Sequence, residues 1–153
     1  MISFSLLFET TYGDLGRMGY IAKHPFLNVG IDLASTLGGA IAGRQYAIKN
    51  NIDPYTGFSF GLVNGSNIGQ LGGELIDRGL RNLEGDPYKG KRQVGDAIRD
   101  FAIGSSVGNA TTGAMRAHDV PLAGIGGFAA GELAKNIYYG ATEPEPAKRK
   151  KKK

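Results

Sequence analysis

The chain has 153 residues, an apolar fraction of 41% and no cysteine or tryptophan. This length predicts one domain with its own core, and the missing cysteines exclude disulfides, zinc–thiolate sites and thiol nucleophiles. The formal net charge of +4 comes from the end of the chain, because six of the 18 lysines and arginines lie at residues 148–153. The rest of the chain has 12 cations and 14 anions, a net charge of −2.

The two ends of the chain differ from its middle. Residues 1–24 have mixed polarity and are typical of an N-terminal arm; the apolar run at 2–8 lacks a signal peptide's basic flank and cleavage site. We interpret this run as a strand or short packed segment, with an amphipathic anchor as the alternative. Residues 141–153 are rich in proline and charge and indicate a disordered polybasic tail. Between them we expect a glycine-rich helical domain at residues 25–140.

The first expected helix follows Pro25, and the second begins at Asp53-Pro54. The aspartate is suited to cap free amides, the proline fits the first helical turn, and Gly85 suits a left-handed cap at the end. We expect large apolar residues to face inward and charged ones to face water. The residues expected to face inward are Leu33, Leu37, Ile41, Ile48, Leu71, Leu75 and Ile76. Those expected to be exposed to solvent are Glu74, Asp77, Arg78 and Arg81.

Within the second helix, glycine stands at every fourth position: Gly57, Gly61, Gly65, Gly69 and Gly73. On a helix these residues form one bare stripe, which costs about 3–5 kcal/mol unless another backbone packs against it. Weaker repeats occur at Ser35, Gly39, Gly43 and Ala47, at Gly104, Gly108 and Thr112, and at Gly127 and Gly131. Such spacing is typical of close-packed helices, although a strand also places every fourth residue on one face. We therefore predict an all-α bundle of about four close-packed helices, with a strand or loop as the alternative.

The dipeptide Asp86-Pro87 repeats the start signal of the second helix. DPYTG at 53–57 and DPYKG at 86–90 lie 33 residues apart, and Asp119 follows 33 residues later. The spacing suggests three turn-plus-helix units, with convergent capping as the alternative. In the third helix we expect Val94, Ile98 and Ala102 to face inward, with Asp96 and Asp100 on a solvated face. The fourth, over residues 120–140, is the most apolar.

No segment passes cleanly as a membrane span. The one comparable uncharged window, residues 54–73, contains Asn64, Ser66, Asn67 and Gln70. The other helices are interrupted by Asp32, Arg44, Asp96, Arg99, Asp100, Glu132 and Lys135. Such helices span a bilayer only where their polar faces meet one another or a water-filled cavity. We expect a soluble or interfacial bundle, with a true span as the alternative.

Residues 104–140 resemble the last two helices of the mitochondrial inner-membrane preprotein translocase family. A GxxxG-like helix ends in Arg116, and a short loop with Pro121-Leu122 leads to a glycine-rich helix. Upstream, LGGELID, a basic stretch and Asp86-Pro87-Tyr88 are similar to that family's second helix and loop. The resemblance covers roughly residues 35–140 and implies four tilted helices around a lipid-facing polar cavity that guides precursors. This chain is more polar and adds a longer insertion after Pro87 and a Lys-rich tail.

Groups suited to catalysis are sparse. His24 precedes a proline, and His118 beside Asp119 is typical of a turn. We expect no enzyme activity, no metal and no cofactor. The clearest interaction signal is the tail, whose adjacent cations attract the phosphates of nucleic acid or anionic lipid. These cations are Lys148, Arg149, Lys150, Lys151, Lys152 and Lys153.

We therefore predict a non-enzymatic structural component of a larger membrane-associated or viral assembly, such as a minor capsid component. Its partners are other subunits, which pack on the small-residue faces, and phosphate groups of lipid or nucleic acid. The alternative is an integral membrane channel or transport component similar to a translocase. Its polar path is lined by Asn64, Asn67, Gln70 and Asp77.

Overall fold

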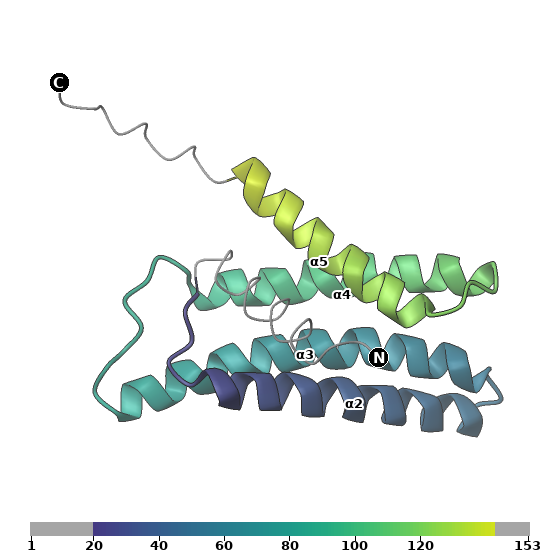
Figure 1. Cartoon of the computed structure of the whole chain (residues 1–153), viewed down its shortest axis with the longest axis horizontal. Coiled ribbons are helices and arrows are strands. Elements are labelled where there is room, and N and C mark those ends of the chain that lie inside the picture. The colour runs from purple at the N-terminus through teal and green to yellow at the C-terminus, as the bar shows by residue number, and fades with distance from the viewer. Residues whose placement is uncertain (1–19, 143–153) are drawn as a thin grey trace.

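The computed structural model describes residues 20–142, which form four helices and no strand within that range (Figure 1). The helices are α2 (Pro25–Lys49), α3 (Pro54–Leu83), α4 (Val94–Ala117) and α5 (Ala123–Thr142). The prediction of an all-α bundle of four helices is confirmed for this range. The predictions for residues 1–19 and for the Lys-rich tail lie outside the described residues.

Local chemistry sets where the helices begin and end. The Asp53 side chain accepts a hydrogen bond of 2.7 Å from the Thr56 amide, so α3 starts as expected, and Gly85 has a φ of +71° after its end. Asp86-Pro87 does not itself start a helix, and α4 begins at Val94, the first of the residues expected in the third helix. Asp86 is instead engaged by Lys23 at 3.3 Å. The amide that precedes α4, that of Gln93, donates to Asp96 at 2.7 Å.

The four helices form two antiparallel hairpins, α2–α3 and α4–α5, and α3 contacts each of the other three helices (Figure 1). Both hairpin turns, residues 50–53 and 118–122, lie at the same end, which we call the turn end. There the Leu122 amide donates to the Tyr55 hydroxyl at 2.8 Å. The opposite end, with residues 20–24 and 84–93 and the last turn of α5, is the loop end.

Glycine faces bring α2 and α3 into backbone contact. A Cβ atom added at Gly39 would lie 2.7 Å from the Gly65 Cα and closer still to the Gly61 carbonyl oxygen. A Cβ atom at Gly131 would lie 2.7 Å from the Gly104 carbonyl oxygen, so α4 and α5 meet in the same way. Most glycines predicted to pack helices would likewise place a Cβ atom against the backbone of another helix: Gly39, Gly43, Gly57, Gly61, Gly65, Gly69, Gly108, Gly127 and Gly131. At Gly73 and Gly104 the nearest atoms belong to side chains, those of Asn28 and of Asn67 and Lys135.

The predicted directions of the helix faces are wrong. Seven large apolar residues expected to face inward are exposed: Leu33, Leu37, Ile41, Ile48, Leu75, Ile76 and Ile98. Val94 and Ala102 are exposed as well, while the expected wet residues Glu74, Asp77 and Asp100 are buried. The physical reason is that small residues occupy the contacts. Helices that touch through glycine leave no room for leucine or isoleucine between them.

Adjacent glycines of α2 provide a matched test of this contact. Gly38 has open space where its Cβ would lie, whereas Gly39 faces the α3 backbone. We expect Gly39→Ala to lower the free energy of unfolding by about 1–3 kcal/mol through overpacking. Gly38→Ala should raise it by about 0.5–1 kcal/mol, because alanine is the better helix former. Helicity followed during denaturant unfolding measures both changes, and equal effects would contradict the contact.

Candidate functional site

The interior of the bundle is polar and its surface is apolar, the reverse of an ordinary water-soluble protein. Among the described residues, the buried hydrophobic set is small: Tyr20, Ala40, Ala47, Val63, Ala97 and Ala123. The buried charged set is larger: Asp32, Glu74, Asp77, Arg92, Asp100, Glu132 and Lys135. Twenty large hydrophobic residues are exposed. Charged pairs and glycine contacts, not aliphatic packing, therefore hold the centre of the bundle.

The first interior cluster surrounds Lys135 of α5, which is 1% exposed. Its ammonium lies 2.6 Å from a carboxylate oxygen of Glu132 and donates to Asn67 at 3.1 Å and to Gln70 at 2.8 Å. Gln70 in turn donates to Glu132 at 3.2 Å. All three donor positions of the ammonium are thus used, which is the condition for keeping a charge out of water.

The second cluster surrounds Arg92, which precedes α4 and reaches back into the bundle. Its guanidinium contacts Glu74 of α3 at 2.9 Å and Asp100 of α4 at 2.6 Å. Tyr139 of α5 donates to Asp100 at 2.6 Å. Burial alone would lower the pKa of Arg92, but the bond to Glu74 and the charges of Glu74 and Asp100 raise it above its usual value. Arg92 therefore joins α3, α4 and α5 as a permanent cation.

A cavity of about 10 Å³ lies between these clusters. Its polar lining comes from both of them: Asn67 and Gln70 from the first, and Glu74, Arg92 and Asp100 from the second. This volume matches about one water molecule, which needs two to four polar partners. Between the two clusters the polar interior thus has room for about one water molecule.

Of the four residues predicted to line a polar path, Asn67 and Asp77 are buried and Asn64 and Gln70 are half-buried, and each is engaged by other groups. Asn64 and Asn109 of α4 exchange amide hydrogen bonds of 3.2 and 2.9 Å. Asn67 and Gln70 hold Lys135. Asp77 is covered by residues 20–24, whose Tyr20 hydroxyl donates to it. Burial and this carboxylate raise the pKa of Tyr20.

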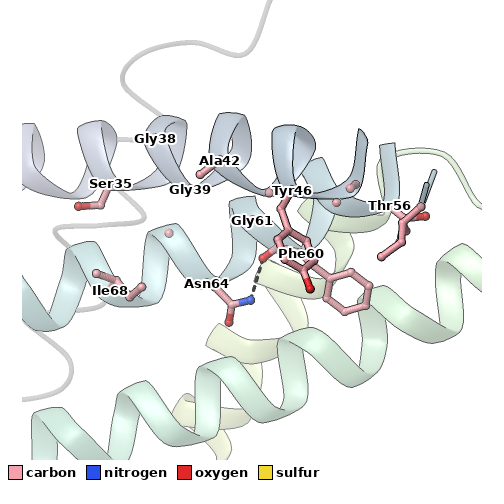
Figure 2. Close-up of a pocket in the computed structure, with 15 residues that line it drawn as sticks. Ser35, Gly38, Gly39, Ala42, Tyr46, Thr56, Phe60, Gly61, Asn64 and Ile68 are labelled. Atoms are coloured by element: carbon pink, nitrogen blue, oxygen red, sulfur yellow. Dashed lines mark hydrogen bonds between the residues drawn. The ribbon is translucent and has the colours of Figure 1, made fainter. Parts of the chain in front are cut away.

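An apolar groove of about 780 Å³ runs along α2 and α3 (Figure 2). Its floor is made by the small residues of both helices, and Tyr46, Ile52, Phe60 and Ile68 are among the larger residues that line it. Asn64 also lines the groove, and its amide donates to the Phe60 carbonyl oxygen at 3.0 Å (Figure 2). The groove offers contact area and almost no hydrogen-bonding groups.

Four interior residues were not predicted as such from the sequence: Glu74, Arg92, Glu132 and Lys135. A usable signal exists for three buried charges that continue the fourfold glycine stripes. Asp77 follows Gly73, Lys135 follows Gly131, and Asp100 precedes Gly104, each by four residues. Because residues four positions apart lie on the same face of a helix, a charged residue in register with packed glycines also faces the inside of the bundle. Arg92 carries no such signal, because it lies outside the helices.

No protein-family model matches the chain, and no curated protein or solved structure is detectably similar to it. The resemblance to the translocase family therefore stays a prediction. Among residues 20–142, no three His, Cys, Asp or Glu side chains gather as a metal site.

Replacement of Lys135 tests the first cluster. We expect Lys135→Met to lower the free energy of unfolding by about 3–5 kcal/mol, because Glu132 is left buried without its cation. The double variant Lys135→Met, Glu132→Gln should recover at least half of this loss. Lys49→Met, at the exposed end of α2, is the control and should change stability by less than about 0.5 kcal/mol. Additive losses in the double variant would contradict the pairing.

Proposed function

We propose that the chain is a non-enzymatic structural subunit embedded in a lipid bilayer, where its apolar surface packs against lipid and other subunits of an assembly. The inverted burial pattern is the observation that carries this proposal. In lipid, polar groups must be satisfied inside the protein, and charged side chains face the interior. An apolar exterior of this extent in water would be an aggregation liability.

The position of charges along the helices supports the proposal. Four charged residues lie seven or more residues from the nearest helix end, about two turns or more: Asp32, Glu74, Glu132 and Lys135. All four are buried. Charges that face outward, such as Arg44 and Lys49, lie near the turn end of α2, from which a long side chain reaches the headgroups.

Aromatic residues support it as well. The described tyrosines lie at the two ends of the bundle: Tyr46 and Tyr55 near the turn end, and Tyr20, Tyr88, Tyr138 and Tyr139 near the loop end. Tyrosine is enriched where a membrane meets water. The 25 residues of α2 span about 37 Å, enough to cross a hydrocarbon core of about 30 Å.

Hydropathy alone singles out α2 as the one described helix that is long and apolar enough to cross a membrane. The averages of α3, α4 and α5 are lowered by polar residues such as Asn67, Glu74, Asp100 and Lys135, which are buried in the bundle. A hydropathy window counts these side chains as if they faced lipid. Their burial is the reason for extending the proposal to all four helices.

A structural role fits the apolar groove, which offers contact area to a neighbouring subunit, whereas most of the small-residue faces are used within the bundle. The Lys-rich tail, residues 148–153, would add contacts to phosphate groups of anionic lipid or nucleic acid. A membrane within a virus particle is one setting that places both next to such a protein.

A translocase-like transport component is the second candidate. The observation that favours it is a polar column, in which Asn64, Asn67, Gln70 and Asp77 follow one another along α3. Transport requires these groups to exchange their mutual bonds for a polar cargo. Dye efflux from liposomes distinguishes the two functions, since a structural subunit leaves the dye enclosed and a transport component releases it.

Membrane integration is tested by flotation with lipid vesicles before and after alkaline extraction. We expect the full chain and a version ending at Gly140 to stay with the lipid through alkali, because the helices and not the tail insert. Alkali releases proteins that only adhere to the surface. Release of both versions would contradict the proposal, and flotation of the full chain alone, reversed by high salt, would indicate attachment by the tail.

The orientation of the bundle is tested by labelling single cysteines from one side of the membrane. Lys89, Lys91 and Arg92 lie in the loop at the loop end, and the turns 50–53 and 118–122 contain no lysine or arginine. Positive loops stay on the cytoplasmic side. We expect an impermeant maleimide to reach Lys89→Cys from that side only and His118→Cys from the opposite side only. Labelling of both from one side would contradict four spans.

A further inference from the structure

A short strap, residues 20–24, crosses α3 at the loop end and covers Asp77. The carboxylate of Asp77 is 0% exposed. Four of its hydrogen bonds come from the strap: one from the Tyr20 hydroxyl, one from the Lys23 amide at 3.1 Å, and two from the amide and ring of His24 at 2.8 and 2.9 Å. Arg81 supplies a fifth at 3.0 Å. The strap is therefore what separates this end of the polar interior from water.

The His24 ring lies between two carboxylates. Its Nδ1 is 2.9 Å from Asp77 and its Nε2 is 3.1 Å from Glu84. An ionised carboxylate only accepts hydrogen bonds, and the hydrogen bond from Lys23 holds the pKa of Glu84 below its usual value. A neutral imidazole has one N–H, whereas the imidazolium has two. Both contacts form together only when the ring carries a proton on each nitrogen.

The balance of charges around His24 also favours a ring that is protonated on both nitrogens. The charged groups around the ring are Lys23 on the strap, Asp77, Arg81 and Glu84 on α3 and its end, and Asp86 on the following loop. The Tyr20 hydroxyl also faces Asp77. Without His24 these groups carry two cations against three anions. A protonated His24 makes the set neutral, so its proton is part of the structure that closes the loop end.

We propose that the strap is a protonation-controlled latch: charged His24 ties residues 20–24 to Glu84 as well as to Asp77, and loss of its proton releases the Glu84 contact and loosens the strap. Glu84 is half-exposed, so a neutral ring keeps its bond to buried Asp77 and Glu84 turns to solvent. The latch is thus closed at low pH, where the His24 ring carries both protons, and loosens as pH rises and one proton is lost. The inference depends on the strap alone and stands whether or not the helices span a membrane.

The chain has no cysteine, so two spin labels can be placed without background. Ile21 on the strap is 75% exposed, and Gly79 on α3 has open space around its Cβ position. We would label Ile21→Cys and Gly79→Cys in the full chain in detergent micelles and measure their distance distribution at pH 5.5 and 8.5. One short distance is expected at pH 5.5. At pH 8.5 the population at a longer distance should grow by about tenfold or more, as the loss of one hydrogen bond between charged groups implies.

Two histidine variants decide the outcome. His24→Gln cannot become charged and should show the longer distance equally at both pH values. His118→Gln changes the chain's other histidine, exposed at the turn end, and should leave the response intact. The latch is refuted if the unmodified pair shows no pH response, if His24→Gln retains it, or if His118→Gln removes it. Should His24→Gln lose its helicity, Glu84→Gln removes the second carboxylate and should weaken the response in the same way.

Discussion

The close contact between the glycine faces of α2 and α3 determines how the rest of the bundle is arranged. Because Gly39 and Gly61 place backbone against backbone, the two helices leave no space between them for a large side chain. Leucines and isoleucines of both helices are consequently displaced to the outer surface. The remaining face of α3 has to satisfy α4 and α5, and it does so with asparagine, glutamine and carboxylate groups. The inverted bundle follows from this one contact.

Burying charge in such a bundle has a structural consequence for the loop between α3 and α4. Glu74 and Asp100 lie on different helices, and both need a cation inside the protein. Arg92 meets both of them at less than 3 Å, which fixes how residues 84–93 fold back before α4 can begin. This need explains why the Asp86-Pro87 signal does not start a helix. Its aspartate serves Lys23 while the chain continues to Arg92.

The sequence was sufficient to predict the helices, because their signals are local. Pro25, the Asp53 cap and Gly85 act within a few residues of their own positions. The direction in which each helix faces could not be predicted in the same way, because a leucine stripe packs equally well against a protein core or a lipid chain. A leucine stripe is therefore compatible with a face toward the core and with a face toward lipid. The fourfold spacing of glycine indicated the packed face of each helix more reliably. Arg92 and the role of His24 depend on contacts between residues far apart in the chain, which no local pattern encodes.

In the proposed bilayer, these contacts also account for specificity. Lipid chains are as apolar as leucine, so helices gain little from burying aliphatic surface against each other, and association depends on close packing and polar pairs. Each interface of the bundle has such a feature. Glycine faces join α2 to α3 and α4 to α5, the Asn64–Asn109 pair joins α3 to α4, and Lys135 joins α5 to Asn67 and Gln70 of α3. A helix displaced by one turn would lose these partners and leave a buried charge without a counter-ion, which disfavours other arrangements of the same four helices.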